Sequence, residues 1–107
     1  MKAMLLALSV TLFFNVAHAE GDPAAGKKTA QQCASCHGPD GNSTSPTYPK
    51  LAGQHEDYLT QALHDYKSGA RENSTMAGMA GPLSEQDIED LAAYFSQQQG
   101  LSQPEID

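Results

Sequence analysis

Two cysteines and a histidine stand together in the segment Cys33-Ala34-Ser35-Cys36-His37, and they are the residues best suited to chemistry. Thiols separated by two residues can form thioether bonds to both vinyl groups of one porphyrin. The histidine beside the second thiol is then held under the ring, where its imidazole can ligate the iron. The segment therefore predicts one haem c, attached through Cys33 and Cys36, with His37 as an axial ligand.

Three other uses of the same residues are open at this point. A thioredoxin-type redox pair would lie at a strand-to-helix turn of a βαβ unit, and the sequence shows no such setting. A zinc site needs four ligands, so His55 and His64 would have to complete it. A structural disulfide suits an exported chain but leaves His37 without a role. Covalent haem accounts for both cysteines and the histidine.

A second axial ligand is available in the glycine-rich segment Met76-Ala77-Gly78-Met79-Ala80-Gly81-Pro82. A methionine opposite a histidine suits haem iron to electron transfer and raises its potential. The small residues allow a loop to approach a flat ring closely. Ligation chemistry alone allows Met76 or Met79, and either could instead be apolar packing. We expect His55 and His64 at polar, solvent-facing positions of a helix.

The first residues have the pattern of a secretory signal peptide. Lys2 gives a positive start, an apolar run follows from Leu5 to Val16, and Ala17-His18-Ala19 places small residues before a cleavage site. The run is shorter than the roughly 20 residues that span a bilayer. We therefore expect cleavage after Ala19, export to the periplasm, and a mature domain of residues 20–107.

The formal net charge of the chain is −7. Such acidity disfavours nucleic acid and anionic membrane surfaces as partners. It could steer the chain towards a basic docking patch on a partner protein, with an association rate that falls as salt is added. Equally, it could serve only to keep the protein soluble and monomeric. The domain is also small, and small domains often need a metal, a disulfide or a cofactor to complete their core.

Turn-forming residues divide the chain into predicted helices and loops. The dipeptide Asp22-Pro23 is typical of a helix start, and Ser84 with Asp87 resembles a capping box. Gly69 and Gly100 stand where helix C-caps belong. The predicted helices cover residues 23–32, 55–68 and the segment from 84 to about 100, and the predicted loops cover residues 38–50 and 70–82.

The second and third predicted helices each carry an apolar stripe at helical spacing. Helices this short bury little surface against one another, so we expect them to wrap the haem. The stripes consist of Tyr58, Leu59, Ala62, Leu63 and Tyr66 in the second helix, and of Ile88, Leu91, Ala92 and Phe95 in the third.

With these residues the chain resembles a class I cytochrome c over about residues 21–99. Gly26 matches a glycine of the family's N-terminal helix that an aromatic of the last helix crosses closely, and Tyr94 matches that aromatic. The resemblance implies an all-α class I cytochrome c fold, with about three helices wrapped around one covalently bound haem.

The same resemblance implies further haem contacts. Pro49, twelve residues after His37, matches a proline whose carbonyl accepts the proximal imidazole N–H, a bond that orients the ligand. Leu51 and Leu91 match residues that pack against the haem. Lys67 and Arg71 are placed where a cation could meet a haem propionate or could simply face solvent.

Two segments, Tyr48–Gln54 and Leu83–Ile88, resemble most closely one half of the dihaem periplasmic cytochromes of bacteria and their monohaem relatives. In that group the ligand methionine precedes the serine of a Leu-Ser pair by eight residues, as Met76 precedes Ser84. The resemblance thus implies His37/Met76 ligation. The single C-x-x-C-H segment implies one haem.

These features predict a soluble periplasmic carrier of single electrons that catalyses no reaction on a substrate. Its partners would be a redox protein donor and acceptor, and the chain would be a monomer or a weak homodimer, without stable membrane insertion. One alternative is a haem-based sensor or small-ligand-binding module with a labile sixth ligand. Another is a haem subunit docked permanently on an oxidoreductase.

Overall fold

The computed structural model describes residues 2–11 and 20–102. Residues 2–11 are exposed and form neither helix nor strand. The end of the apolar run and the predicted cleavage site at Ala19 lie outside the described residues, as does the end of the C-terminal tail. No helix among the described residues is long and apolar enough to cross a bilayer.

The first helices deliver the chain to the cysteine motif. α1 (Pro23–Thr29) begins at Asp22, whose side chain accepts a hydrogen bond from the Ala24 N–H at 2.9 Å. Its last turn tightens into the 3₁₀ helix η1 (Ala30–Gln32), and α2 (Ala34–His37) follows as a single turn. The predicted first helix is therefore confirmed, with a 3₁₀ end.

The second and third predicted helices are also confirmed. α3 (Glu56–Ser68) ends at Gly69, whose φ of 85° is the left-handed conformation that favours glycine. α5 (Glu85–Ser96) begins with a complete capping box, in which Ser84 and Asp87 exchange hydrogen bonds of 3.0 Å. However, α5 ends at Gln97, so the prediction of a C-cap at Gly100 is wrong. Gly100 instead packs against Ala52.

The loop predicted over residues 70–82 contains a helix, α4 (Ser74–Ala80). The side chain of Asn73 caps it by accepting the Met76 N–H at 3.0 Å, and Pro82 follows its end. One glycine in a seven-residue helix costs only about 1 kcal/mol relative to alanine. The Asn73 cap offsets a cost of this size, and the methionines lie on a helix rather than on a loop.

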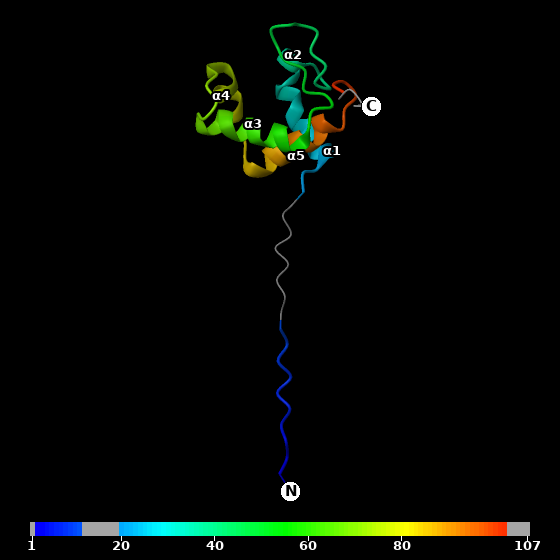
Figure 1. The fold of residues 1–107 in the computed structure, drawn as a ribbon, viewed down its shortest axis with the longest axis vertical. Coiled ribbons are helices and arrows are strands. Elements are labelled where there is room, and N and C mark those ends of the chain that lie inside the picture. The colour runs from blue at the N-terminus through cyan, green and yellow to red at the C-terminus, as the bar shows by residue number, and fades with distance from the viewer. Residues whose placement is uncertain (1, 12–19, 103–107) are drawn as a thin grey trace, which may run out of the picture.

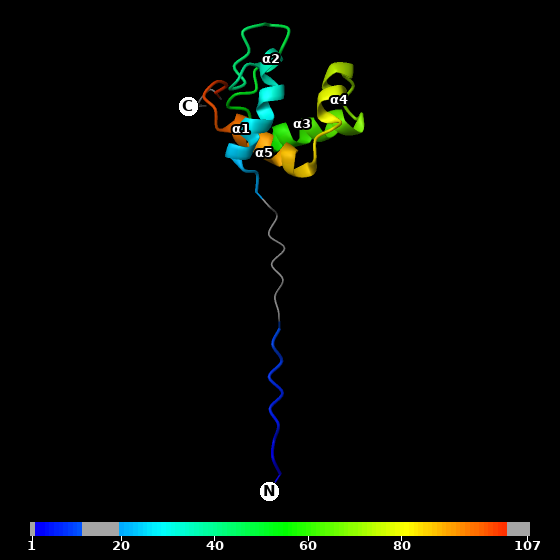
Figure 2. The same ribbon diagram turned by 180° about the vertical axis from the view of Figure 1, so that it is seen from behind.

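All described elements are helices or loops, as the all-α prediction requires, although α2 and α4 raise the number of helices above three. Figures 1 and 2 show α3 extending from the crossing of α1 and α5 toward α4, with α2 on the other side of the open space above α3. α5 packs against both α1 and α3. The buried core follows α5 and consists mainly of Leu59, Leu83, Ile88, Leu91, Ala92, Tyr94 and Phe95.

α1 and α5 cross with backbone nearly touching backbone. A Cβ atom on Gly26 would lie 2.0 Å from the Asp90 carbonyl oxygen and 2.9 Å from the Tyr94 Cβ. The predicted close crossing of Gly26 and Tyr94 is confirmed. Asp90 is buried and its Oδ1 accepts hydrogen bonds from the Asp22 N–H and the Gln86 side chain, both at 2.8 Å.

A network of hydrogen bonds ties the loop after His37 to α5. Tyr94 donates its hydroxyl to the Pro39 carbonyl at 2.9 Å. Asn42 donates its side-chain N–H groups to Asp40 at 3.0 Å and to the Gln99 carbonyl at 2.7 Å. The hydrogen bonds from Asn42 lower the pKa of the Asp40 carboxyl, since they favour its charged form.

The crossing predicts a large cost for Gly26→Ala. The new methyl group cannot avoid the Asp90 backbone, and overpacking of this kind costs about 1–3 kcal/mol or more. We expect a correspondingly lower free energy of unfolding in urea. Gly78→Ala is the matched control, because Gly78 also lies in a helix and has nothing within 4 Å of its added Cβ. Equal stability of the two variants would contradict the close crossing.

The lowered pKa of Asp40 predicts that this carboxylate makes a pH-dependent contribution to the free energy of unfolding. Because its pKa is lowered in the folded state, the contribution is present above the ordinary pKa of about 3.9 and is lost as the pH falls through the folded value. Asp40→Asn should therefore lower the free energy of unfolding near neutral pH. In this variant the free energy of unfolding should also decrease less as the pH falls. Urea unfolding across this range tests it, with Glu72→Gln, an exposed carboxylate, as the control.

Candidate functional site

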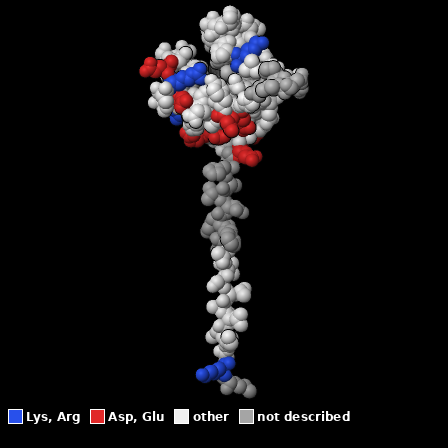
Figure 3. Space-filling model, viewed as in Figure 1, with Lys and Arg blue, Asp and Glu red and all other residues white. Residues whose placement is uncertain are grey.

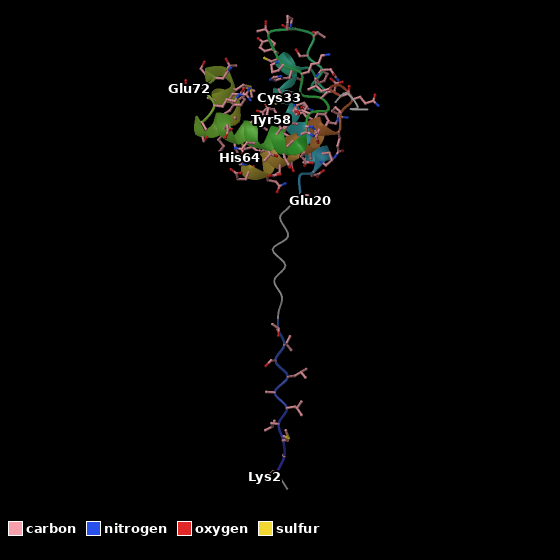
Figure 4. The ribbon with its side chains drawn as sticks, viewed as in Figure 1. Lys2, Glu20, Cys33, Tyr58, His64 and Glu72 are labelled. Carbon is pink, nitrogen blue, oxygen red and sulfur yellow. The ribbon has the colours of Figure 1, made fainter. Side chains whose placement is uncertain are left out.

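One cavity of about 570 Å³ is enclosed by η1, α2, the loop over residues 47–51, α3, α4 and α5. The volume lies within the roughly 300–1,000 Å³ of cofactor and ligand pockets, and most of the lining is apolar. Figure 4 labels Cys33 and Tyr58, both of which line the cavity, in the folded part of the chain. All of the site residues predicted from the sequence line this cavity, namely Cys33, Cys36, His37, Pro49, Leu51, Met76 and Leu91.

The cysteines enter the cavity from consecutive short elements. Cys33 ends η1, and Cys36 lies in the single turn of α2. Both are free thiols. Burial raises the pKa of the Cys33 thiol, and the neighbouring Cys36 raises it further. This wall of the cavity therefore favours the uncharged thiol over the thiolate. The sulfur of a thioether is also uncharged.

His37 is oriented by a backbone carbonyl. Its Nδ1 lies 2.8 Å from the Pro49 oxygen. A carbonyl can only accept, so Nδ1 carries the proton and a neutral ring keeps its lone pair on Nε2, as metal ligation requires. The Tyr48 ring meets the imidazole edge-on, with centroids 6.4 Å apart. The His37–Pro49 contact that the resemblance implied is present.

α3 and α5 supply the apolar walls. Every residue of the predicted α3 stripe lines the cavity, so this stripe faces the cavity along its whole length. Ala92 and Phe95 of the predicted α5 stripe also line it, together with Leu91. Tyr48 lines it too, and sequence reasoning did not assign this residue to the site. Tyr48 precedes Pro49 and lies outside both apolar stripes, so helical spacing could not have found it.

Both candidate methionines line the cavity from α4. Their spacing of three residues puts them on one face of the helix. Met76 is half-buried, whereas Met79 is 37% exposed. Neither His55 nor His64 lines the cavity. His64 instead pairs with Glu85 through Nε2 and Oε2 at 3.0 Å, and no group of three or more His, Cys, Asp or Glu residues in the described part of the chain could hold a metal ion.

The two candidate cations have different surroundings. Lys67 donates from Nζ to the Gly81 carbonyl at 3.0 Å and to the Leu83 carbonyl. It thereby ties the connection between α4 and α5 to the end of α3. Arg71 lines the cavity, with its guanidinium 4.8 Å from the centre of the Tyr66 ring.

Comparisons with known proteins agree with this geometry. The family model described as Cytochrome c matches residues 23–99. Cytochrome c4 of Pseudomonas aeruginosa is 46% identical over 110 residues, which cover 99% of this chain and 55% of that protein. The crystal structure of reduced recombinant cytochrome c4 from Pseudomonas stutzeri superposes with a TM-score of 0.72 at 49% identity, covering 76% of this chain and 47% of that one.

Two further relatives, one of about the same length as the matched region and one much longer, extend the comparison. Cytochrome c-554(548) of Halomonas halodenitrificans is 43% identical over 82 residues, which cover 74% of this chain and 99% of that protein. A protein of Thiomonas intermedia named thiosulfate dehydrogenase electron acceptor is 40% identical over 82 residues, covering 76% of this chain and 38% of its own. The chain thus spans about half the length of the cytochromes c4 and nearly all of the Halomonas protein.

The contacts of Lys67 predict that Lys67→Met loosens α4. Hydrogen bonds from a charged donor are each worth about 1.5–3 kcal/mol, and exposure of the lysine reduces this value. We expect the free energy of unfolding to fall by about 1–2 kcal/mol and proteolysis between α4 and α5 to become faster. Lys27→Met, at an exposed position of α1, is the control, and equal behaviour of the two variants would contradict the anchoring role.

Proposed function

The chain belongs to the cytochrome c family, and from this premise we propose that it carries single electrons between redox proteins. The observation that carries the proposal is the meeting of Cys33, Cys36, His37 and two methionines on the walls of one apolar cavity. This family binds haem c covalently through such a cysteine pair, and Cys33 and Cys36 form the pair here.

The residues present fit that cofactor. The cavity has cofactor size and apolar walls, both thiols are on its lining, and the Nδ1 of the imidazole is engaged by the Pro49 carbonyl, which leaves Nε2 for the iron. When bound, haem iron supplies a reversible one-electron couple between its ferric and ferrous states. The chain's own residues set the conditions for that couple by holding the ligands and excluding water.

We propose His37 and Met76 as the axial ligands and Pro49, Leu51 and Leu91 as further contacts of the haem. The Pro49 carbonyl supports His37 as a fixed, strongly basic ligand, since a hydrogen bond at Nδ1 has that effect. Met76 is supported by its place on the cavity wall and by its half-buried position, and by the eight-residue spacing from Ser84.

We further propose that the chain acts in the periplasm after cleavage at Ala19 and converts no substrate itself. The signal-peptide pattern supports export. The name of the Thiomonas relative, an electron acceptor of a dehydrogenase, supports exchange of electrons with redox enzymes. A basic docking patch on the partner and a monomeric or weakly dimeric state stay predictions from the net charge.

The ligand assignment is tested by expressing the full chain in a bacterium that matures c-type haem. We expect haem to stay bound through denaturation, because the thioethers are covalent. The ferric protein should show the weak band of methionine-to-iron charge transfer, and Met76→Ala should abolish it. Met79→Ala is the matched control and should retain it.

Other spectra would contradict parts of this proposal. Loss of the band in Met79→Ala alone would make Met79 the ligand. A wild-type protein without the band that binds carbon monoxide at once would have an open sixth position. That result would replace the electron carrier with a haem-based sensor.

A further inference from the structure

Little of α4 is buried, although this helix carries the methionine that we propose as the ligand opposite His37. Within α4 only its last residue, Ala80, is buried, Met76 is half-buried, and the other residues are exposed. Among the helices, α4 packs chiefly against α3. The position of Met76 at the cavity therefore depends on how the ends of α4 are attached to α3.

Two side chains of α3 hold the segment that connects α4 to α5. Lys67 donates from Nζ to the carbonyl oxygen of Gly81 at 3.0 Å and to that of Leu83. His64, one helical turn earlier, lies 3.0 Å from Glu85, measured between Nε2 and Oε2. A carboxylate accepts the hydrogen bond, so Nε2 carries the proton whether the ring is charged or neutral. We call the side chains of His64, Lys67 and Glu85 the latch.

The latch fixes the connecting segment at three alternate residues. These are Gly81, Leu83 and Glu85, and the Leu83 side chain is buried as well. Figures 1 and 2 show the segment, yellow in the colour bar, passing beside α3 on its way to α5. A movement of the end of α4 relative to α3 would break at least one of these contacts.

The start of α4 follows an exposed turn. Residues 71–75 are exposed. The turn is attached to α3 by the Arg71 N–H, which donates to the Asp65 carbonyl at 3.1 Å, and by the Arg71 guanidinium, which lies over the Tyr66 ring. This turn gives α4 a pivot at its start, and the latch holds the opposite end.

Glu85 of the latch belongs to an acidic surface. It lines a groove together with Glu20, Glu56, Asp57 and Glu89. Figure 3 shows red side chains gathered at the end of the folded part where the N-terminal segment leaves it. Neighbouring carboxylates repel one another, so a hydrogen-bond donor beside Glu85 is favourable there. An apolar residue in place of His64 would remove that donor.

We propose that the latch keeps α4 against the cavity, and that His64 and Lys67 are therefore positioning residues for the methionine ligand. Neither side chain lines the cavity, so each acts through the helix and not on the haem. A broken latch would let α4 move and would raise the rate at which the methionine leaves the iron. This inference rests on the proposed function, because it requires a methionine of α4 as the ligand.

The test measures carbon monoxide binding to the haem-loaded full chain in its ferrous state. Carbon monoxide needs the sixth position, so at saturating gas the binding rate reports how often the methionine leaves. We expect Lys67→Met to raise this rate about fivefold and His64→Leu to raise it about twofold. The ferric forms of both variants should also lose the methionine-to-iron band at a lower temperature than the wild type.

Conservative replacements and a charge control separate the latch from general effects. Lys67→Arg keeps a cationic donor and His64→Gln keeps an N–H donor, so both variants should bind carbon monoxide at close to the wild-type rate. Lys27→Met removes the same charge as Lys67→Met at an exposed position of α1. It should leave the rate unchanged.

Unfolding of the same variants in urea distinguishes positioning from stability. Lys67→Met and His64→Leu proteins that unfold more easily but bind carbon monoxide no faster than Lys27→Met would overturn the proposal. An equal rise of the rate in Lys67→Arg and His64→Gln would overturn it as well. A wild-type protein that lacks the methionine band and binds carbon monoxide at once would instead overturn the proposed ligand pair, and the latch with it.

Discussion

The structure depends on a cavity that the chain cannot fill with its own side chains. The cavity of about 570 Å³ is lined mainly by apolar side chains, which lack packing partners from the chain on the side that faces the cavity. The helices are accordingly arranged as walls. α3 turns its apolar stripe toward the cavity, and the packed core is confined largely to α5 and its neighbours. The prosthetic group is thus part of the core as well as the redox centre.

A rigid frame is needed to hold such walls apart, and the α1–α5 crossing supplies it. Gly26 allows the two backbones to approach, and buried Asp90 receives the N–H of Asp22 at the start of α1. The same helix pair fixes the ligands on one side. α1 leads through η1 to Cys33, and Tyr94 of α5 holds the Pro39 carbonyl just beyond His37. On the other side, α4 and its methionines depend on Lys67 for their link to α3. His37 and the methionines are therefore supported by different parts of the fold.

Local sequence signals predicted those features whose cause is local. The capping box at Ser84, the end of α3 at Gly69 and the His37–Pro49 contact each follow from a few residues or from family spacing. Features that arise from tertiary contacts were not predictable in the same way. Gly100 resembles a helix C-cap but packs against Ala52. α4 is a different case, because its cap at Asn73 is a local signal, whereas the glycines around the methionines favoured a loop. Lys67 and Arg71 lie four residues apart in the sequence, yet one binds backbone carbonyls and the other lines the cavity.

The acidic net charge has a structural origin in the directions of α3 and α5. Carboxylates are favourable in the first turn of a helix, where they complement the partial positive charge of the N-terminus. α3 and α5 both begin with acidic residues, Glu56 and Asp57 in one and Glu85 in the other, and these residues line the same groove. Helix capping thus gathers negative charge at the end of the domain where these helices start. α3 lines the cavity along its whole length, from Tyr58 to Tyr66, together with α4 and the loop that holds Lys50, and no Asp or Glu is among the lining residues. The acidic groove is therefore a consequence of helix direction, which composition alone does not report.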